Sequence, residues 1–220
     1  YANDFSGEEQ EWVRGLTNQG LIEYYEINDG LEFIPGTQAD YSNSGYVLLA
    51  EIISRISALS FPNYMQTSIF QPTGMVNSYV IDEENPIQNN VALNFASSPV
   101  PFNFELYLNG ALAQVSSLND INNFLTALLN NEIVSQESFE VMIQPHSNLP
   151  STGGTLGYAW HQGTGNVTSY DINGSNDGFQ SLIILVPVVD LQVVILSNGG
   201  ESTNTHKKNI FRLINEFYNQ

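Results

Sequence analysis

The stretch that decides the fold is Phe33-Ile-Pro-Gly-Thr-Gln-Ala-Asp-Tyr-Ser-Asn-Ser-Gly-Tyr-Val-Leu-Leu-Ala-Glu-Ile-Ile53. Its Pro-Gly pair is typical of a turn, because Pro presets its own φ and Gly tolerates positive φ. Apolar residues beyond the turn predict a helix over residues 43–57 that buries one face, formed by Tyr46, Leu49, Ile52, Ile53 and Ile56. Tyr41, Ser42 and Asn43 therefore lie where a loop becomes a helix. Either Ser42 or Asn43 simply caps the helix while Tyr41 packs on the core, or these side chains point into a cleft.

The composition is that of an acidic globular chain. Of 220 residues, 42% are hydrophobic, and 23 Asp and Glu against 5 Lys and Arg give a formal charge of -18. This charge opposes extended contact with nucleic acid or an anionic membrane surface, so a small-molecule or peptide substrate, or a protein partner, is expected. The absence of Cys excludes disulfides, thiolate nucleophiles and Cys-based zinc sites. No stretch approaches the ~18 apolar residues of a membrane helix.

The pattern of the sequence changes near residue 145. Region 1–145 is predicted to be mainly helical, with helices over residues 8–19, 43–57, 62–70 and 136–144 and another after the capping sequence Ser117-Leu-Asn-Asp120. Gly20 is expected to end the first helix, and residues 21–33 to form a connection. Region 146–220 is predicted to form an antiparallel sheet, with strands over 157–161, 167–171, 179–187 and 191–197. A C-terminal helix over 203–218 is expected to pack on this sheet through Ile210, Phe211, Ile214 and Phe217.

Five stretches carry a resemblance to a known family: Phe33-Ile-Pro-Gly36 running to Tyr41-Ser-Asn-Ser-Gly-Tyr46, Phe70-Gln-Pro-Thr-Gly-Met75, Val115-Ser-Ser-Leu-Asn-Asp120, Leu156-Gly-Tyr-Ala-Trp160, and Gly174-Ser-Asn-Asp-Gly-Phe-Gln-Ser181 leading to Leu196-Ser-Asn198. The chain resembles the penicillin-recognising serine hydrolases, in particular the branch of class C β-lactamases, D-alanyl-D-alanine carboxypeptidases and related esterases. The order and spacing are similar to the C-terminal two-thirds of that family. The resemblance implies an α+β fold of the β-lactamase/transpeptidase type that lacks the family's N-terminal helix and strands. It also implies that the protein is bacterial.

The resemblance also implies a mechanism and site residues. Such enzymes join a Ser-x-x-Lys nucleophile, a Tyr-x-Asn pair that moves protons and orients substrate, and a Lys-Thr-Gly or His-x-Gly strand beside the oxyanion. The resemblance maps Tyr41 and Asn43 onto the second motif as catalytic residues. It maps Ile172-Asn173-Gly174 onto the third, with the backbone N–H of Ser175 as the oxyanion donor. The implied function is acyl transfer, namely hydrolysis of an ester, an amide or a β-lactam.

The chain departs from this pattern first in its nucleophile. It contains no Ser-x-x-Lys, since its only lysines are Lys207 and Lys208 and neither has a Ser three residues earlier. We expect the nucleophile to lie outside this chain, which begins abruptly at Tyr1 like a processed or excised piece. The missing elements would leave a hydrophobic edge and face uncovered. A complementing N-terminal segment or chain is therefore an expected partner, and a periplasmic or secreted location is implied by the resemblance.

The second departure is Ile172, where relatives carry Lys or His. An unperturbed Tyr has a pKa of about 10, and it needs cationic neighbours to act as a base near neutrality. With Ile172 in place of a cation, we expect Tyr41 to stay protonated. This substitution favours an alternative function: a non-catalytic pseudoenzyme or fragment that binds a peptide, a peptidoglycan-like ligand or a protein partner.

Metal and cofactor sites are not predicted. Asp171-x-Asn173-x-Ser175-x-Asp177 has oxygen ligands at alternate positions like the start of a calcium loop, but it lacks Gly at position six and Glu at position twelve. A polar loop between strands is the favoured interpretation. His146, His161 and His206 do not have metal-ligand spacing.

Overall fold

The computed structural model of the chain describes residues 17–27, 31–93, 108–149, 154–163, 167–176, 178–199 and 203–218. The chain forms two compact units, one of Tyr1–Val91 with Asn103–Asp120 and the other of Ala92–Phe102 with Ile121–Gln220. Most of the helix predicted over residues 8–19 lies outside the described residues. The predicted boundary at residue 145 marks a change in secondary structure, whereas the compact units divide elsewhere.

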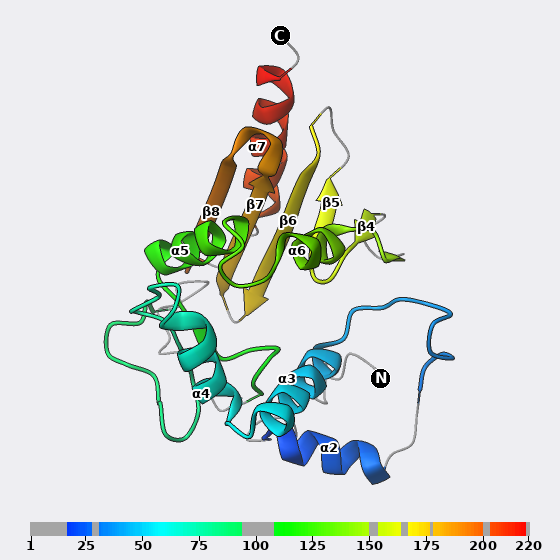
Figure 1. The fold of residues 1–220 in the computed structure, drawn as a ribbon, viewed down its shortest axis with the longest axis vertical. Helices are drawn as coiled ribbons and strands as arrows, with labels where there is room; N and C mark the ends of the chain where they lie inside the picture. Colours follow the sequence, from blue (N-terminus) through cyan, green and yellow to red (C-terminus); the bar gives the residue numbers. More distant parts are fainter. Residues whose placement is uncertain are drawn as a thin grey trace. The chain divides into compact units, whose positions relative to one another are not determined.

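The first unit is built on helices. They are α2 (Asn18–Ile27), α3 (Asn43–Ser57), α4 (Phe61–Met65) and the π-helical turn η2 (Gln66–Phe70), joined by the two-stranded sheet β1 (Tyr79–Val80) and β2 (Gln114–Val115) (Figure 1). The predicted bounds of α3 are confirmed. Ser42 caps this helix, since its Oγ accepts a hydrogen bond from the Gly45 N–H at 3.1 Å, and Ala58 ends it with φ 57°.

The buried face of α3 differs from the prediction. The residues that are buried are Ser44, Val47 and Ala50. Of the large side chains predicted to form the buried face, Ile53 is half-buried, and the others are exposed: Tyr46 38%, Leu49 54%, Ile52 50% and Ile56 82%. This face is buried because its smaller side chains let neighbouring segments approach the helix closely. Val47 packs with Leu21 and Leu108. The prediction was wrong in its choice of face, and an apolar stripe remains exposed.

The extent of α2 also differs from the prediction. Gly20 does not end a helix, and residues 21–27 do not form a connection, because α2 continues through them to Ile27. Leu21 is fully buried against Val47 and Leu108. The burial of this side chain offsets the helix penalty of about 1 kcal/mol for the preceding Gly.

Gly110 permits the close packing on α3. A Cβ at Gly110 would lie 2.5 Å from the Tyr46 carbonyl oxygen and 2.7 Å from the Ala50 Cβ, and its φ is +98°. We expect Gly110→Ala to lower the free energy of unfolding by about 3 kcal/mol, through overpacking and backbone strain. Gly36→Ala is the matched control, since Gly36 also has positive φ, +81°, but nothing lies within 4 Å of its Cβ position. Urea unfolding measures both, and equal losses would show that the close approach is unimportant.

A buried carboxylate connects the small sheet to helix α5 (Leu118–Leu129). Asp120 is 1% exposed, and its Oδ2 accepts hydrogen bonds from the Asn77 N–H and the Ser78 hydroxyl, each at 2.7 Å. The Asp120 N–H in turn donates to Ser117 Oγ at 3.2 Å, which confirms the predicted capping sequence. The negative charge is favoured in the first turn of a helix.

The second unit contains a six-stranded antiparallel sheet in the order β3-β4-β5-β6-β7-β8. Its strands are β3 (Ser147–Leu149), β4 (Gly154–Leu156), β5 (His161–Gly163), β6 (Ser169–Asn176), β7 (Phe179–Val186) and β8 (Leu191–Ser197). The predicted hairpin is confirmed as β7 and β8, joined by the 3-10 turn η3 (Pro187–Val189). A strand over 157–161 was wrong, because residues 157–159 bend between β4 and β5.

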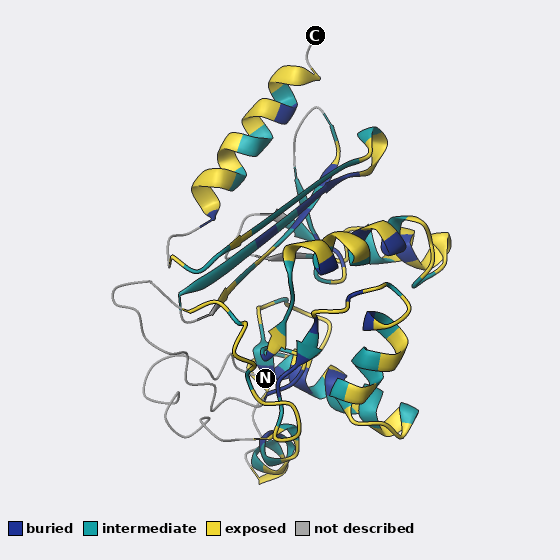
Figure 2. Ribbon diagram, turned by 90° about the vertical axis from the view of Figure 1, so that its left-hand side faces the viewer, coloured by how far each residue is buried: buried dark blue, intermediate teal, exposed yellow. Residues whose placement is uncertain are grey.

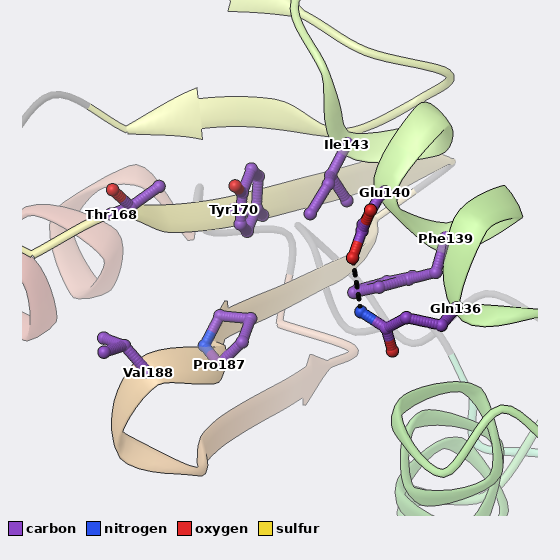
Figure 3. A pocket seen from close by; sticks show the side chains of 8 residues that line it. All are labelled: Gln136, Phe139, Glu140, Ile143, Thr168, Tyr170, Pro187 and Val188. Atoms are coloured by element: carbon purple, nitrogen blue, oxygen red, sulfur yellow. Dashed lines mark hydrogen bonds between the residues drawn. The ribbon is translucent and has the colours of Figure 1, made fainter.

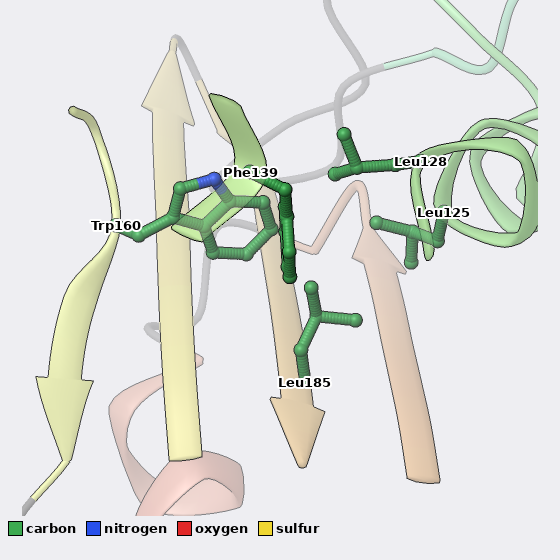
Figure 4. Close-up of a cluster of buried hydrophobic side chains, with 5 residues drawn as sticks. All are labelled: Leu125, Leu128, Phe139, Trp160 and Leu185. Atoms are coloured by element: carbon green, nitrogen blue, oxygen red, sulfur yellow. The ribbon is translucent and has the colours of Figure 1, made fainter. Parts of the chain in front are cut away.

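Helices cover both faces of this sheet. On one face, α5 and α6 (Gln136–Ile143) pack on a cluster formed by Leu125, Leu128, Phe139, Trp160 and Leu185 (Figure 4). On the other, α7 (Asn204–Phe217) packs on Leu182, Ile184 and Val186, the alternate residues of β7. Ile210, Phe211 and Ile214 make this contact as predicted, but Phe217 is 71% exposed. Figure 2 shows exposed segments alternating with more buried ones along α7.

In the described part of the chain, no single helix reaches the length and hydropathy needed to cross a membrane. Among the described helices, α3 and the segment Phe61–Phe70 reach this length and hydropathy only when taken together, and the two are bent by 76° relative to each other.

Candidate functional site

The start of α3 holds the predicted catalytic pair. Tyr41 lies two residues before the helix and Asn43 is its first residue, and the Tyr41 phenol donates a hydrogen bond to Asn43 Oδ1 at 2.8 Å. Tyr41 is 54% exposed, so its ring is open to a ligand from solvent. The structure therefore brings the two residues of the Tyr-x-Asn motif into direct contact, with Ser42 between them acting as the helix cap. The capping hydrogen bond is made by Ser42, and the Tyr41–Asn43 hydrogen bond is separate from it.

The environment of Tyr41 favours the neutral phenol. Partial burial raises the pKa of Tyr41 above its usual value of 10, and the nearby Tyr46 raises it further by charge repulsion. The hydrogen bond that the phenol donates to Asn43 also favours the protonated form. Within this chain, Tyr41 is thus equipped to donate a proton or a hydrogen bond near neutral pH.

The third predicted motif lies on β6, in the second unit. Ile172 is half-buried, and its side chain packs against the core cluster that includes Trp160 and Leu185. It sits opposite Ile183 of β7 in the antiparallel register. The position that the resemblance maps onto a Lys or His is therefore an apolar residue packed against the core here.

Gly174 and Ser175 follow on the same strand. Gly174 is paired with Ser181, and a Cβ at Gly174 would lie 2.6 Å from Ser181 Oγ, a contact that rotation of the Ser181 side chain would relieve. The side chains of Asn173 and Ser175 are exposed, and Ser175 Oγ accepts a hydrogen bond from Gln180 Nε2 at 2.6 Å. The strand presents small polar groups at this end.

The calcium-like sequence on β6 has a structural role at its first residue. Asp171 is 2% exposed and forms an ion pair with Lys207 of α7. Residues 171–176 form a continuous strand, which sends alternate side chains to opposite faces and does not wrap around an ion. Among the described residues, no group of three or more His, Asp or Glu side chains has the arrangement of a metal site.

The second unit also has a shallow groove between α6, β6 and η3. It has a volume of about 260 Å³ and an apolar floor that includes Phe139, Ile143 and Pro187 (Figure 3). At its rim, Gln136 Nε2 donates a hydrogen bond to Glu140 Oε1 at 3.0 Å. None of the predicted site residues lines this groove.

Sequence reasoning missed one contact next to the motif. Tyr25 of α2 and Ser44 of α3 are joined by a hydrogen bond between their hydroxyl groups, with an O–O distance of 2.9 Å. Tyr25 follows Leu21 at helical spacing, which indicates a helix. The prediction of a connection over residues 21–33 did not use this spacing.

Comparison with known proteins identifies the family. The model of the family described as Beta-lactamase matches residues 4–215. The chain belongs to the Beta-lactamase family. This member of the family is 29% identical to penicillin-binding protein 4* of Bacillus subtilis (strain 168) over 214 residues, covering 88% of this chain and 45% of that protein. Its β-lactamase/transpeptidase-like α+β fold, expected from the sequence, is confirmed.

Solved structures agree with this assignment of the fold. The octameric penicillin-binding protein homologue from Pyrococcus abyssi has a TM-score of 0.75 and 26% identity, covering 84% of this Beta-lactamase-family chain and 44% of that one. D-amino acid amidase from Ochrobactrum anthropi SV3 has a TM-score of 0.76 and 21% identity, covering 99% of this chain and 68% of that one. The chain spans about half the length of the curated relatives it matches.

Proposed function

We propose that this chain contributes the Tyr-x-Asn part of a serine-hydrolase acyl-transfer site that acts on an ester, an amide or a β-lactam. The observation that carries the proposal is the 2.8 Å hydrogen bond from the Tyr41 phenol to Asn43 at the start of α3. In this proposal a nucleophilic Ser from outside these 220 residues attacks the substrate carbonyl and forms an acyl ester. Tyr41 passes the Ser proton to the leaving group, and water then hydrolyses the ester. Asn43 orients the substrate, and the Ser175 N–H donates to the oxyanion.

A complementing N-terminal segment or chain, called the complementing polypeptide below, is part of the proposal. It would carry the Ser-x-x-Lys motif, which this chain lacks. The exposed stripe of Tyr46, Leu49, Ile52 and Ile56 on α3 supports it, because large apolar side chains aligned on one helix favour contact with another apolar element. The stripe begins at Tyr46, in the first turn of α3 and close enough to raise the pKa of Tyr41, so an element that covers it would bring its own residues near the phenol. A periplasmic or secreted location, as for many enzymes acting on cell-wall peptides, belongs to the same proposal.

The second candidate is a non-catalytic relative that binds a peptide, a peptidoglycan-like ligand or a protein partner. The packing of Ile172 in the core favours it, because this strand then offers no cation to the site. Under this alternative, Tyr41 and Asn43 bind a ligand by hydrogen bonds and no acyl ester forms.

One experiment separates the two candidates. The 220-residue chain, alone and with a complementing polypeptide that contains Ser-x-x-Lys, is incubated with a fluorescent penicillin and with a p-nitrophenyl ester. Intact mass then reports any covalent adduct. We expect an acyl adduct on the complementing polypeptide and none on the chain alone. An adduct on the isolated chain would contradict the external nucleophile, and no adduct in an assembled complex would favour the non-catalytic function.

A further inference from the structure

The hydroxyl pair of Tyr25 and Ser44 lies directly behind the predicted catalytic residues. Ser44 is fully buried and is the residue that follows Asn43. Its Oγ is 2.9 Å from the Tyr25 phenol oxygen, so α2 contacts the first turn of α3 through a polar side chain at the position next to the motif.

Helix α2 is itself held firmly, which makes it a suitable support. Leu21 is fully buried in the cluster with Val47 and Leu108. At the N-terminal end of α2, Asn18 Nδ2 donates to the Asn109 carbonyl at 3.1 Å, and the Asn109 N–H donates to Asn18 Oδ1 at 2.9 Å. These contacts anchor the N-terminal half of α2, and a support that is anchored transmits little motion to the group it contacts.

The two neighbours of Asn43 are therefore both anchored. On one side, Ser42 Oγ accepts from the Gly45 N–H at 3.1 Å; on the other, Ser44 contacts Tyr25. Helix N-termini fray readily, and a cap alone is worth only about 1 kcal/mol. The added contact with α2 restricts the rotation of the first turn, and with it the direction of the Asn43 amide.

We propose that Tyr25 is a positioning residue for the Tyr41–Asn43 pair, acting through Ser44. This inference rests on the proposed function of that pair. Tyr25 is assigned no contact with substrate. Its hydroxyl keeps Asn43 Oδ1 within hydrogen-bond distance of the Tyr41 phenol, so that the proton-transfer group and the substrate-orienting amide keep one relative geometry.

The test measures the pair directly in the 220-residue chain and needs no catalytic activity. Tyrosine is labelled with ¹³C at Cζ, the Tyr41 signal is assigned from the Tyr41→Phe variant, and its pKa is read from an NMR titration. The side-chain amide signals of Asn43 are recorded at neutral pH. Tyr25→Phe keeps the ring and removes the hydroxyl, Ser44→Ala removes the other partner, and the melting temperature of each variant is measured alongside.

We expect Tyr25→Phe to lower the pKa of Tyr41 and to shift the Asn43 amide signals, because the phenol no longer donates its hydrogen bond to a fixed Asn43 Oδ1. Ser44→Ala should act in the same way and add little in the double variant. Tyr24→Phe is the control, because it removes a hydroxyl from the neighbouring ring on α2. The Tyr24 and Tyr25 rings contact edge-to-face, with their centroids 5.4 Å apart.

The proposal is overturned if Tyr25→Phe lowers the melting temperature while the Tyr41 titration and the Asn43 signals stay as in the unaltered chain. It is also overturned if Tyr24→Phe shifts them as much. If Ser44→Ala does not fold, Tyr25→Phe decides alone. The acyl-adduct experiment is independent of these signals, so a failure of the proposed function is recognised separately.

Discussion

Tyr41→Phe is expected to lower the kcat of acyl transfer in the completed enzyme by roughly 10²–10⁴, the range for losing a general acid–base group. The substitution keeps the ring and its partial burial, and it removes only the hydroxyl that donates to Asn43. Steady-state kinetics with a p-nitrophenyl ester measure the change. The substrate KM should change little, because the phenol acts on the proton in transit and not on the bound ground state.

The pH profile tests which role the phenol has. Because burial and Tyr46 raise the pKa of Tyr41, the protonated form predominates below pH 10. A proton donor would therefore keep kcat constant through neutral pH and lose activity as the pH rises through the raised pKa. A phenolate base would show the opposite slope, with kcat rising toward that pKa, unless a cation from the complementing polypeptide lowers it.

Tyr64→Phe provides the matched control, since Tyr64 is a half-buried tyrosine on α4 outside the motif. Its kcat should stay within about twofold of the original. A Tyr41→Phe enzyme with unchanged kcat would remove Tyr41 from the proposed mechanism, and would leave ligand binding as the role of the motif.

Lys207→Met is expected to lower the free energy of unfolding of the second unit by about 3 kcal/mol. Asp171 is 2% exposed, so removal of its partner leaves a buried charge without compensation. The Lys207 side chain is 26% exposed, which places the loss near the lower end of the range for buried pairs. Its ammonium group also lies 5.9 Å from the centre of the Phe211 ring, a weaker contribution to the same contact between α7 and the sheet.

The neighbouring lysine supplies the control for this measurement. Lys208 is exposed, and Lys208→Met removes the same charge from the same helix without touching Asp171. Urea unfolding should show a change below about 0.5 kcal/mol for Lys208→Met. The double variant Asp171→Asn with Lys207→Met should be less destabilised than the sum of the single changes. Equal effects at Lys207 and Lys208 would show that the ion pair adds no stability.

Local signals in the sequence predicted most of the elements. Ser42, Ser117 and the periodic apolar residues after them placed α3 and α5, and the apolar runs 179–187 and 191–197 placed the hairpin of β7 and β8. These elements depend on contacts between near neighbours in the chain, which periodicity and capping report. The resemblance to the serine hydrolases rested on short motifs in a fixed order, and the match over residues 4–215 confirmed the family.

Which side of α3 is buried was decided only in three dimensions. For α3, periodicity favoured the stripe of Tyr46, Leu49, Ile52 and Ile56, yet the small face of Ser44, Val47 and Ala50 is buried. The pattern of one helix shows that an apolar stripe exists; it does not show which partner approaches or how closely. That depended on Gly110 and Leu108, which lie more than fifty residues away and pack on α3.

The sequence by itself therefore determined most of the elements, the family and the position of Tyr41 and Asn43 at the start of a helix. Tertiary structure decided that these two side chains bond to each other, that Tyr25 and Ser44 meet behind them, and that Ile172 belongs to the core. The physical reason is that capping and periodicity act over a few residues, whereas burial and hydrogen bonding between elements join residues that no local pattern relates.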